Sequence, residues 1–214
     1  MESSKGKEDY RFIRGVCYGV PYFKPVEQVK KELGYGKRIH LNSTRIWLIY
    51  QHYKENPQRF LEGLTTYVRT AYEVGFTTMP ILFNGNGPNP DILKPEFRAE
   101  GEKYVRDVVN ALRGEPGLIM WDIMNEPSCN DYIMKSPEGE KGARTSKLWD
   151  FLKHYSRFVK SLDTDHPITI GHTFWMDVEP TVEEVDVISV HDYLSTHKEI
   201  ETTLTSPTSE DFWW

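Results

Sequence analysis

Residues 117–127 read GLIMWDIMNEP, an apolar run that ends in Asn125, Glu126 and Pro127. A short run of this kind, bounded by a glycine and a proline, is typical of a buried strand in a parallel sheet. Pro127 cannot donate a backbone hydrogen bond, so the strand is expected to break or bulge there. Such a bulge would let Asn125 and Glu126 serve one pocket at the carboxyl end of the strand, where parallel βα folds assemble their active sites.

The same pattern recurs along the chain. From residue 12 onward, short apolar runs alternate with longer segments of helical periodicity, which indicates consecutive βα units. The expected strands are 12–20, 43–49, 77–83, 117–124, 167–172 and 186–193. About twenty residues follow Tyr193, whereas one βα unit takes roughly 30. We therefore predict an α/β fold that is an incomplete parallel (β/α) barrel, with about six βα units and strands seven and eight missing.

Three longer helices are expected between these strands. The first begins at Asn56-Pro57, an N-cap followed by a first-turn proline, and ends before Gly75. The second follows Lys94-Pro95, and the third covers 148–162. Shorter helices are expected at 26–33 and 181–185. The predicted organisation is one domain over 10–194, flanked by a polar tail at 1–9 and a second tail at 195–214.

Composition narrows the classes of function. Lys and Arg number 26 against 32 Asp and Glu, a formal charge of −6, which gives no reason to expect nucleic acid or a membrane as partner. The two cysteines, Cys17 and Cys129, lack metal-ligand spacing, so no metal is expected; a disulfide and two buried thiols both stay open. The chain reads as soluble, without a signal peptide in the given sequence, and both a secreted and a cytoplasmic location stay open.

Glu126 is the leading candidate for catalysis. A carboxylic acid at the end of a strand can protonate the glycosidic oxygen of a departing sugar and then act as base toward water. Asn125 would bind a hydroxyl next to the scissile bond. The alternative is that Asn-Glu-Pro forms only a polar turn after a strand.

Two other strands carry residues that suit the same site. Arg45 lies in an otherwise apolar strand, where a buried guanidinium needs a carboxylate or several acceptors. Trp47 would face the same interior. His191 and Tyr193, two residues apart, share one side of the sixth strand and could orient a carboxylate. Arg45 in a structural ion pair and His191 as an ordinary strand-end residue are the alternatives.

Further substrate contacts are expected from the ends of two more strands. His172 could donate a hydrogen bond, and the indole of Trp175 could stack on a pyranose ring. Asn84 opens a polar loop, Asn84-Gly85-Asn86-Gly87, that could reach a substrate. This loop is not a GxGxxG motif, which argues against an open nucleotide-binding sheet.

Taken together, Arg45, Asn125-Glu126-Pro127 and His191-x-Tyr193 resemble glycoside hydrolase clan A, and most of all family five, the cellulases, mannanases and related β-glycanases. The resemblance covers roughly residues 10–194. It implies a TIM-barrel-like fold, a retaining mechanism, Glu126 as acid/base, Asn125 as a ligand of the sugar 2-hydroxyl, and no cofactor. The implied partner is a β-linked oligosaccharide or polysaccharide.

One departure from this family limits the expected activity. The family carries its nucleophile, a second Glu, on strand seven, and often a Trp on strand eight. Glu210-Asp211 and Trp213-Trp214 lie in a tail without strand character. We therefore expect weak or no hydrolysis by the isolated chain. A catalytically silent carbohydrate-binding or self-assembling fragment is the alternative, and a homo-oligomer is expected to cover the open edges of the barrel.

Overall fold

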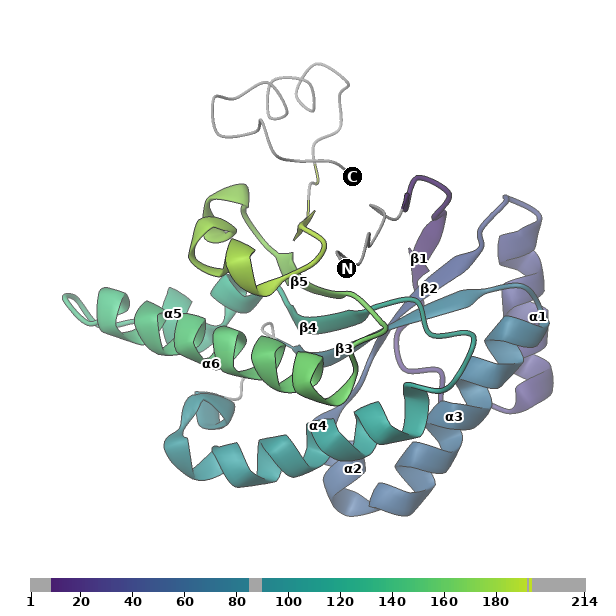
Figure 1. Cartoon of the computed structure of the whole chain (residues 1–214), viewed down its shortest axis with the longest axis horizontal. Helices are drawn as coiled ribbons and strands as arrows, with labels where there is room; N and C mark the ends of the chain where they lie inside the picture. The colour runs from purple at the N-terminus through teal and green to yellow at the C-terminus, as the bar shows by residue number, and fades with distance from the viewer. Residues whose placement is uncertain (1–8, 85–89, 192, 194–214) are drawn as a thin grey trace, which may run out of the picture.

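A computed structural model describes residues 9–84, 90–191 and 193. Six parallel strands form one sheet in the order β1-β2-β3-β4-β5-β6, so each strand pairs with its neighbours in sequence. The sheet curls, and helices cover its outer side (Figure 1). The strands are β1 (Gly15–Cys17), β2 (Ser43–Trp47), β3 (Thr77–Asn84), β4 (Trp121–Asn125), β5 (Ile168–His172) and β6 (Ser189–Val190). The architecture is an incomplete (β/α) barrel, which confirms the predicted fold class.

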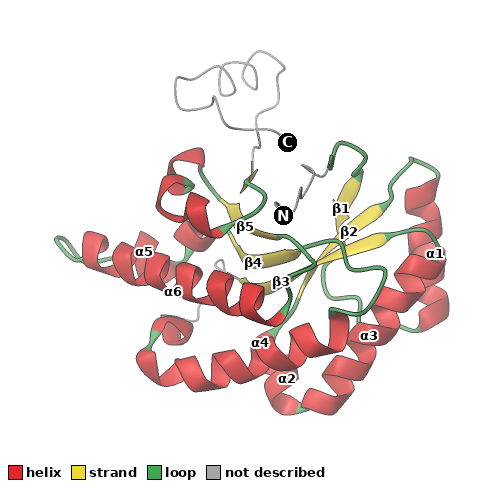
Figure 2. Ribbon diagram, viewed as in Figure 1, coloured by secondary structure: helices red, strands yellow, loops and turns green. Residues whose placement is uncertain are grey.

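Helices connect successive strands, as Figure 2 shows. The α-helices are α1 (Val26–Lys37), α2 (Tyr50–Glu55), α3 (Pro57–Glu73), α4 (Arg98–Leu112), α5 (Asp131–Met134) and α6 (Lys141–Leu162). The short 3-10 helices are η1 (Pro90–Leu93), η2 (Pro95–Phe97), η3 (Pro127–Cys129), η4 (Trp175–Asp177) and η5 (Glu179–Glu184). Helix α3 begins as the sequence predicts: the Asn56 side chain accepts a hydrogen bond from the Arg59 amide at 3.0 Å. Gly75, at φ +86°, follows its end.

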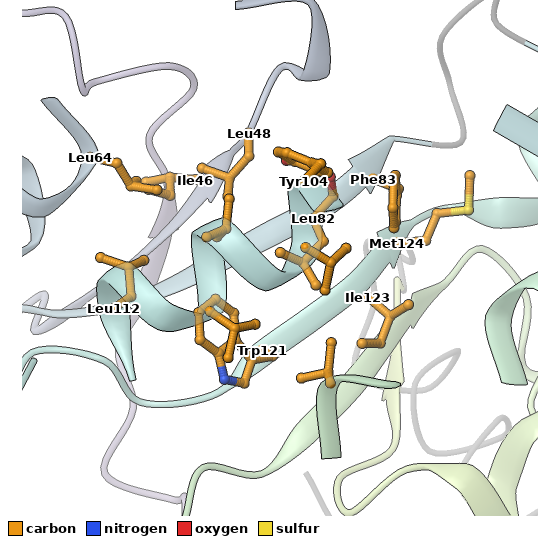
Figure 3. Close-up of a cluster of buried hydrophobic side chains, with 14 of the residues drawn as sticks. Ile46, Leu48, Leu64, Leu82, Phe83, Tyr104, Leu112, Trp121, Ile123 and Met124 are labelled. Carbon is orange, nitrogen blue, oxygen red and sulfur yellow. The ribbon is translucent and has the colours of Figure 1, made fainter. Parts of the chain in front are cut away.

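The main core lies between the sheet and the helices. Residues on the outward side of the strands, such as Ile46, Trp121 and Ile123, are fully buried against apolar helix faces. Figure 3 shows these side chains packed together with Leu64, from α3. The indole Nε1 of Trp121 also donates to Asp163 Oδ2 at 2.9 Å, just beyond α6. This packing fixes the strands, and thereby the residues at their carboxyl ends.

Several boundaries differ from the sequence prediction. The strand expected over 12–20 is found only at Gly15–Cys17, and the strand expected over 186–193 only at Ser189–Val190. The helix expected at 26–33 continues to Lys37. Both cysteines are free thiols, and Cys17 is exposed rather than buried. Within the described ranges, no helix has the length and apolar character to cross a membrane.

Candidate active site

Strands β2 and β4 share a network centred on Arg45. Its Nε and Nη2 donate to Asp122 Oδ2 at 2.9 and 2.6 Å. Its Nη1 donates to Asn125 Oδ1 at 2.9 Å. The Arg45 side chain is 12% exposed and that of Asp122 is 1% exposed, so the predicted partner of this guanidinium is a buried carboxylate on β4. Arg45 therefore has the carboxylate partner that a buried guanidinium needs, and this contact also fits the structural ion pair considered as its alternative.

The surroundings of Arg45 shift its pKa in two opposite directions. Burial lowers the pKa of Arg45, but the adjacent Asp122 carboxylate outweighs that effect and leaves the pKa above its ordinary value. The second oxygen, Asp122 Oδ1, accepts a hydrogen bond from the Gly171 amide of β5 at 3.2 Å. Asp122 therefore accepts hydrogen bonds from Arg45 of β2 and from the backbone of β5.

The backbone at Glu126 has the irregularity that the sequence predicts. The register between β4 and β5 shifts between Asp122 and Asn125. Glu126 then adopts a left-handed conformation, with φ 46° and ψ 60°, which costs a non-glycine residue of order 1–3 kcal/mol. Its amide donates to the Gly171 carbonyl at 2.7 Å. The bulge lets the consecutive residues Asn125 and Glu126 join the same group of side chains.

Two side chains converge on one oxygen of Glu126. His191 Nδ1 lies 2.8 Å from Oε1, and the Tyr193 hydroxyl donates to the same atom at 2.9 Å. The side chains of Glu126 and His191 are 11% and 15% exposed. The hydrogen bond to Glu126 raises the pKa of Tyr193, which keeps the phenol a donor. The carboxyl group is thus held between a largely buried imidazole and a phenol that is 83% exposed.

The predicted substrate-binding residues divide into two groups. Asn84 Oδ1 accepts from Asn125 Nδ2 at 3.2 Å, and the Trp47 ring centroid lies 5.5 Å from the Arg45 guanidinium carbon. Both therefore adjoin the network. Trp175 lies on η4 and is 40% exposed, without a described contact to the network. Residues 85–87 of the polar loop, and the tail residues Glu210, Asp211, Trp213 and Trp214, lie outside the described residues.

His172 corrects the sequence interpretation. It is 2% exposed, and its Nε2 lies 3.0 Å from Thr181 Oγ1 of η5. Alternation along β5 explains this placement, because Gly171 faces the network and the next side chain must face the helices. Burial, with a smaller effect of the His191 charge, lowers the pKa of His172 to about 4. His172 is a neutral core residue in this structure and does not meet the site.

Sequence reasoning missed three features of the site. Asp122 gave the same signal as Arg45, a charged residue inside an apolar strand, but was not singled out. Gly171 gave no signal. The Ser128 hydroxyl donates to the Asp177 carboxylate and lies 3.2 Å from Thr173 Oγ1, which ties the segment after Glu126 to η4. Burial raises the pKa of Asp177. In the described part of the chain, no three His, Cys, Asp or Glu residues form a metal-binding group.

Comparison with known proteins finds sequence relatives over part of the chain. No family model matches the sequence. The chain is 30% identical over 84 residues to mannan endo-1,4-beta-mannosidase A of Aspergillus aculeatus, which covers 39% of this chain and 19% of that protein. It is 27% identical over 86 residues to the probable mannan endo-1,4-beta-mannosidase C of Aspergillus terreus, covering 40% and 21%. These alignments span about a fifth of the relatives' length.

Solved structures extend the likeness to the fold. The endo-1,4-beta-mannanase from Rhizomucor miehei has a TM-score of 0.66 at 16% identity, covering 85% of this chain and 67% of that one. GH5_18 from Streptomyces cattleya, in complex with GlcNAc, has a TM-score of 0.64 at 14% identity, covering 85% and 51%. Over the part that aligns, the chain is similar in sequence to mannan endo-1,4-beta-mannosidases and similar in fold to family-five glycoside hydrolases.

Proposed function

We propose that this chain binds a β-linked glycan, of the β-1,4-mannan class, and supplies the general acid/base of a retaining glycoside hydrolysis. One observation carries the proposal: Glu126 is oriented by His191 and Tyr193 while its neighbour Asn125 belongs to the Arg45 network. Mannan is named as the glycan because the sequence relatives described above are mannan endo-1,4-beta-mannosidases.

In this mechanism each residue has a separate task. Glu126 protonates the oxygen of the leaving sugar and afterwards takes a proton from the attacking water. His191 and Tyr193 fix the carboxyl group, and the Asn125 amide binds the hydroxyl beside the scissile bond. Arg45 holds that amide in place through Nη1.

Retention also requires a second carboxylate about 5 to 5.5 Å from the acid. Asp122 is poorly suited to this task. It is 1% exposed, and its two oxygens accept from Arg45 and from the Gly171 amide. A carboxylate in such an ion pair is a weak nucleophile because its charge is already neutralised. We therefore propose that the isolated chain retains the acid and the sugar contacts but hydrolyses weakly or not at all.

The test measures binding and hydrolysis side by side. Mannohexaose and cellohexaose are titrated by calorimetry into the protein and into Glu126→Gln, and release of reducing sugar is followed in parallel. The expected result is binding in both proteins, with little or no sugar released. Absence of binding to either sugar would refute the proposal. Turnover by a strictly monomeric preparation, abolished in Glu126→Gln, would support the acid role and contradict the proposed weakness.

A second candidate function is a binding module without hydrolysis. The ion pair between Asp122 and Arg45 favours it, because this carboxylate of the network is already bound to a guanidinium. Oligosaccharide binding that Glu126→Gln leaves unchanged, with no turnover even at high protein concentration, would support this candidate over a weakened enzyme.

A further inference from the structure

Gly171 occupies the point where the parts of the site meet. Its amide donates to Asp122 Oδ1, and its carbonyl accepts from the Glu126 amide. One peptide segment of β5 thus holds both the partner of Arg45 and the left-handed turn that aims the acid.

Because Gly171 has no side chain, neighbouring side chains can approach its backbone closely. A Cβ atom there would lie 2.6 Å from Arg45 Nη2, 2.9 Å from His191 Nε2 and 3.2 Å from Asp122 Oδ2. The first two distances are shorter than non-bonded contacts allow. The space beside Gly171 is therefore the space that the guanidinium and the imidazole occupy.

We propose that Gly171 is a positioning residue for the acid Glu126, acting through its two backbone hydrogen bonds and through the room that it leaves for Arg45 and His191. The role in sugar binding rests on the proposed function. The role in geometry does not, because it concerns contacts within the protein alone.

The atoms that a new Cβ would strike are the ends of side chains, not backbone. Gly171 also lies outside the left-handed region, so alanine fits the strand conformation. The cheapest response to Gly171→Ala is then a shift of Arg45 and His191 while the sheet stays intact. We expect a folded protein with a displaced site.

The first experiment follows the imidazole of His191 by nitrogen-15 NMR, with its signal identified by its loss in His191→Gln. In the unaltered protein, the Nδ1 proton bonded to Glu126 is expected to be protected from exchange. In Gly171→Ala that protection is expected to fall at least tenfold. Gly142→Ala is the matched control, because a Cβ there meets nothing within 4 Å. An unchanged His191 signal in Gly171→Ala would overturn the proposal.

The second experiment is a double-mutant cycle on mannohexaose affinity. Gly171→Ala is expected to weaken binding at least tenfold, and much less in an Arg45→Lys background, where the guanidinium is gone. Additive losses would overturn the proposal.

If the unaltered protein binds no oligosaccharide, the proposed function fails and the NMR result alone decides whether Gly171 positions the acid. If Gly171→Ala fails to fold but the double variant folds, the clash with Arg45 is supported; failure of both would overturn it.

Discussion

Loss of Asp122 should destabilise the fold because this carboxylate compensates a buried positive charge. It is 1% exposed and compensates a guanidinium that is itself 12% exposed. Replacement of one member of a buried ion pair leaves the other charge without compensation, which typically costs about 3–5 kcal/mol. We expect Asp122→Ala to lower the free energy of unfolding by that amount, measured by urea denaturation.

An exposed ion pair provides the matched control. Lys135 and Asp131 form an ion pair at 2.8 Å, with side chains 75% and 56% exposed. Exposed pairs contribute about 0–1 kcal/mol. Lys135→Ala should therefore leave the denaturation midpoint nearly unchanged, and equal losses for Asp122→Ala and Lys135→Ala would show that burial of Asp122 is not the cause.

His172 should make stability depend on pH. Burial lowers its pKa from 6.5 to about 4 in the folded protein, so the unfolded chain binds more protons between these values. The stabilisation linked to the neutral His172 imidazole is fully present above pH 6.5. It is lost as pH falls toward 4, by up to about 3 kcal/mol. Urea denaturation at several pH values in this window gives the free energy of unfolding as a function of pH. This free energy should change less with pH in His172→Gln than in the unaltered protein. Parallel slopes would contradict the buried neutral imidazole.

At the residue scale, sequence reasoning could identify chemistry but not pairing. A guanidinium in an apolar strand requires an acceptor, and that requirement predicted a partner for Arg45. It could not single out Asp122, because the register between β2 and β4 is set through β3 and the intervening helices. His172 was placed wrongly for a related reason: whether it or Gly171 faces the site depends on the alternation of β5, which a two-residue pattern does not fix.

At the scale of elements, the contact between α4 and α6 depends on a glycine. A Cβ at Gly101 would lie 2.0 Å from the Tyr155 hydroxyl and 2.7 Å from Phe97 Cε1. Alanine is favoured over glycine in a helix by about 1 kcal/mol, yet overpacking costs typically 1–3 kcal/mol. We expect Gly101→Ala to lower the melting temperature, and to do so less in a Tyr155→Phe background.

Gly34 of α1 offers the opposite case. A Cβ there meets nothing within 4 Å, so Gly34→Ala should be neutral or stabilise by about 0.5–1 kcal/mol. If Gly34→Ala and Gly101→Ala destabilise the protein equally, alanine is poorly tolerated in both helices. The effect of Gly101→Ala would then not report on the contact between α4 and α6.

The long helices could be predicted more fully than the short strands. Helix α3 matches its expected start and end because Asn56, Pro57 and Gly75 act locally. β1 is shorter than its apolar pattern, since a turn from Tyr10 to Ile13 precedes it and Gly19, at φ +62°, follows it. The length of a strand depends on its neighbours in the sheet, and sequence alone does not supply them.

At the scale of the whole molecule, the two end strands of the described sheet, β1 and β6, each pair on one side only. Exposed strand edges with apolar side chains favour association. Val16, in the middle of β1, is 38% exposed. We predict that the chain self-associates through this edge and that the charged variant Val16→Lys weakens the association.

Multi-angle light scattering at micromolar concentration tests this prediction. The unaltered chain should have the mass of two or more copies, and Val16→Lys should shift it toward one copy. Ile39→Lys is the control, because Ile39 is 69% exposed but lies outside the strands, after α1. It removes an apolar surface residue without changing a sheet edge, so it should leave the mass unaltered. A compact monomer for the unaltered chain, or an equal effect of both variants, would mean that the edge of β1 does not hold the copies together.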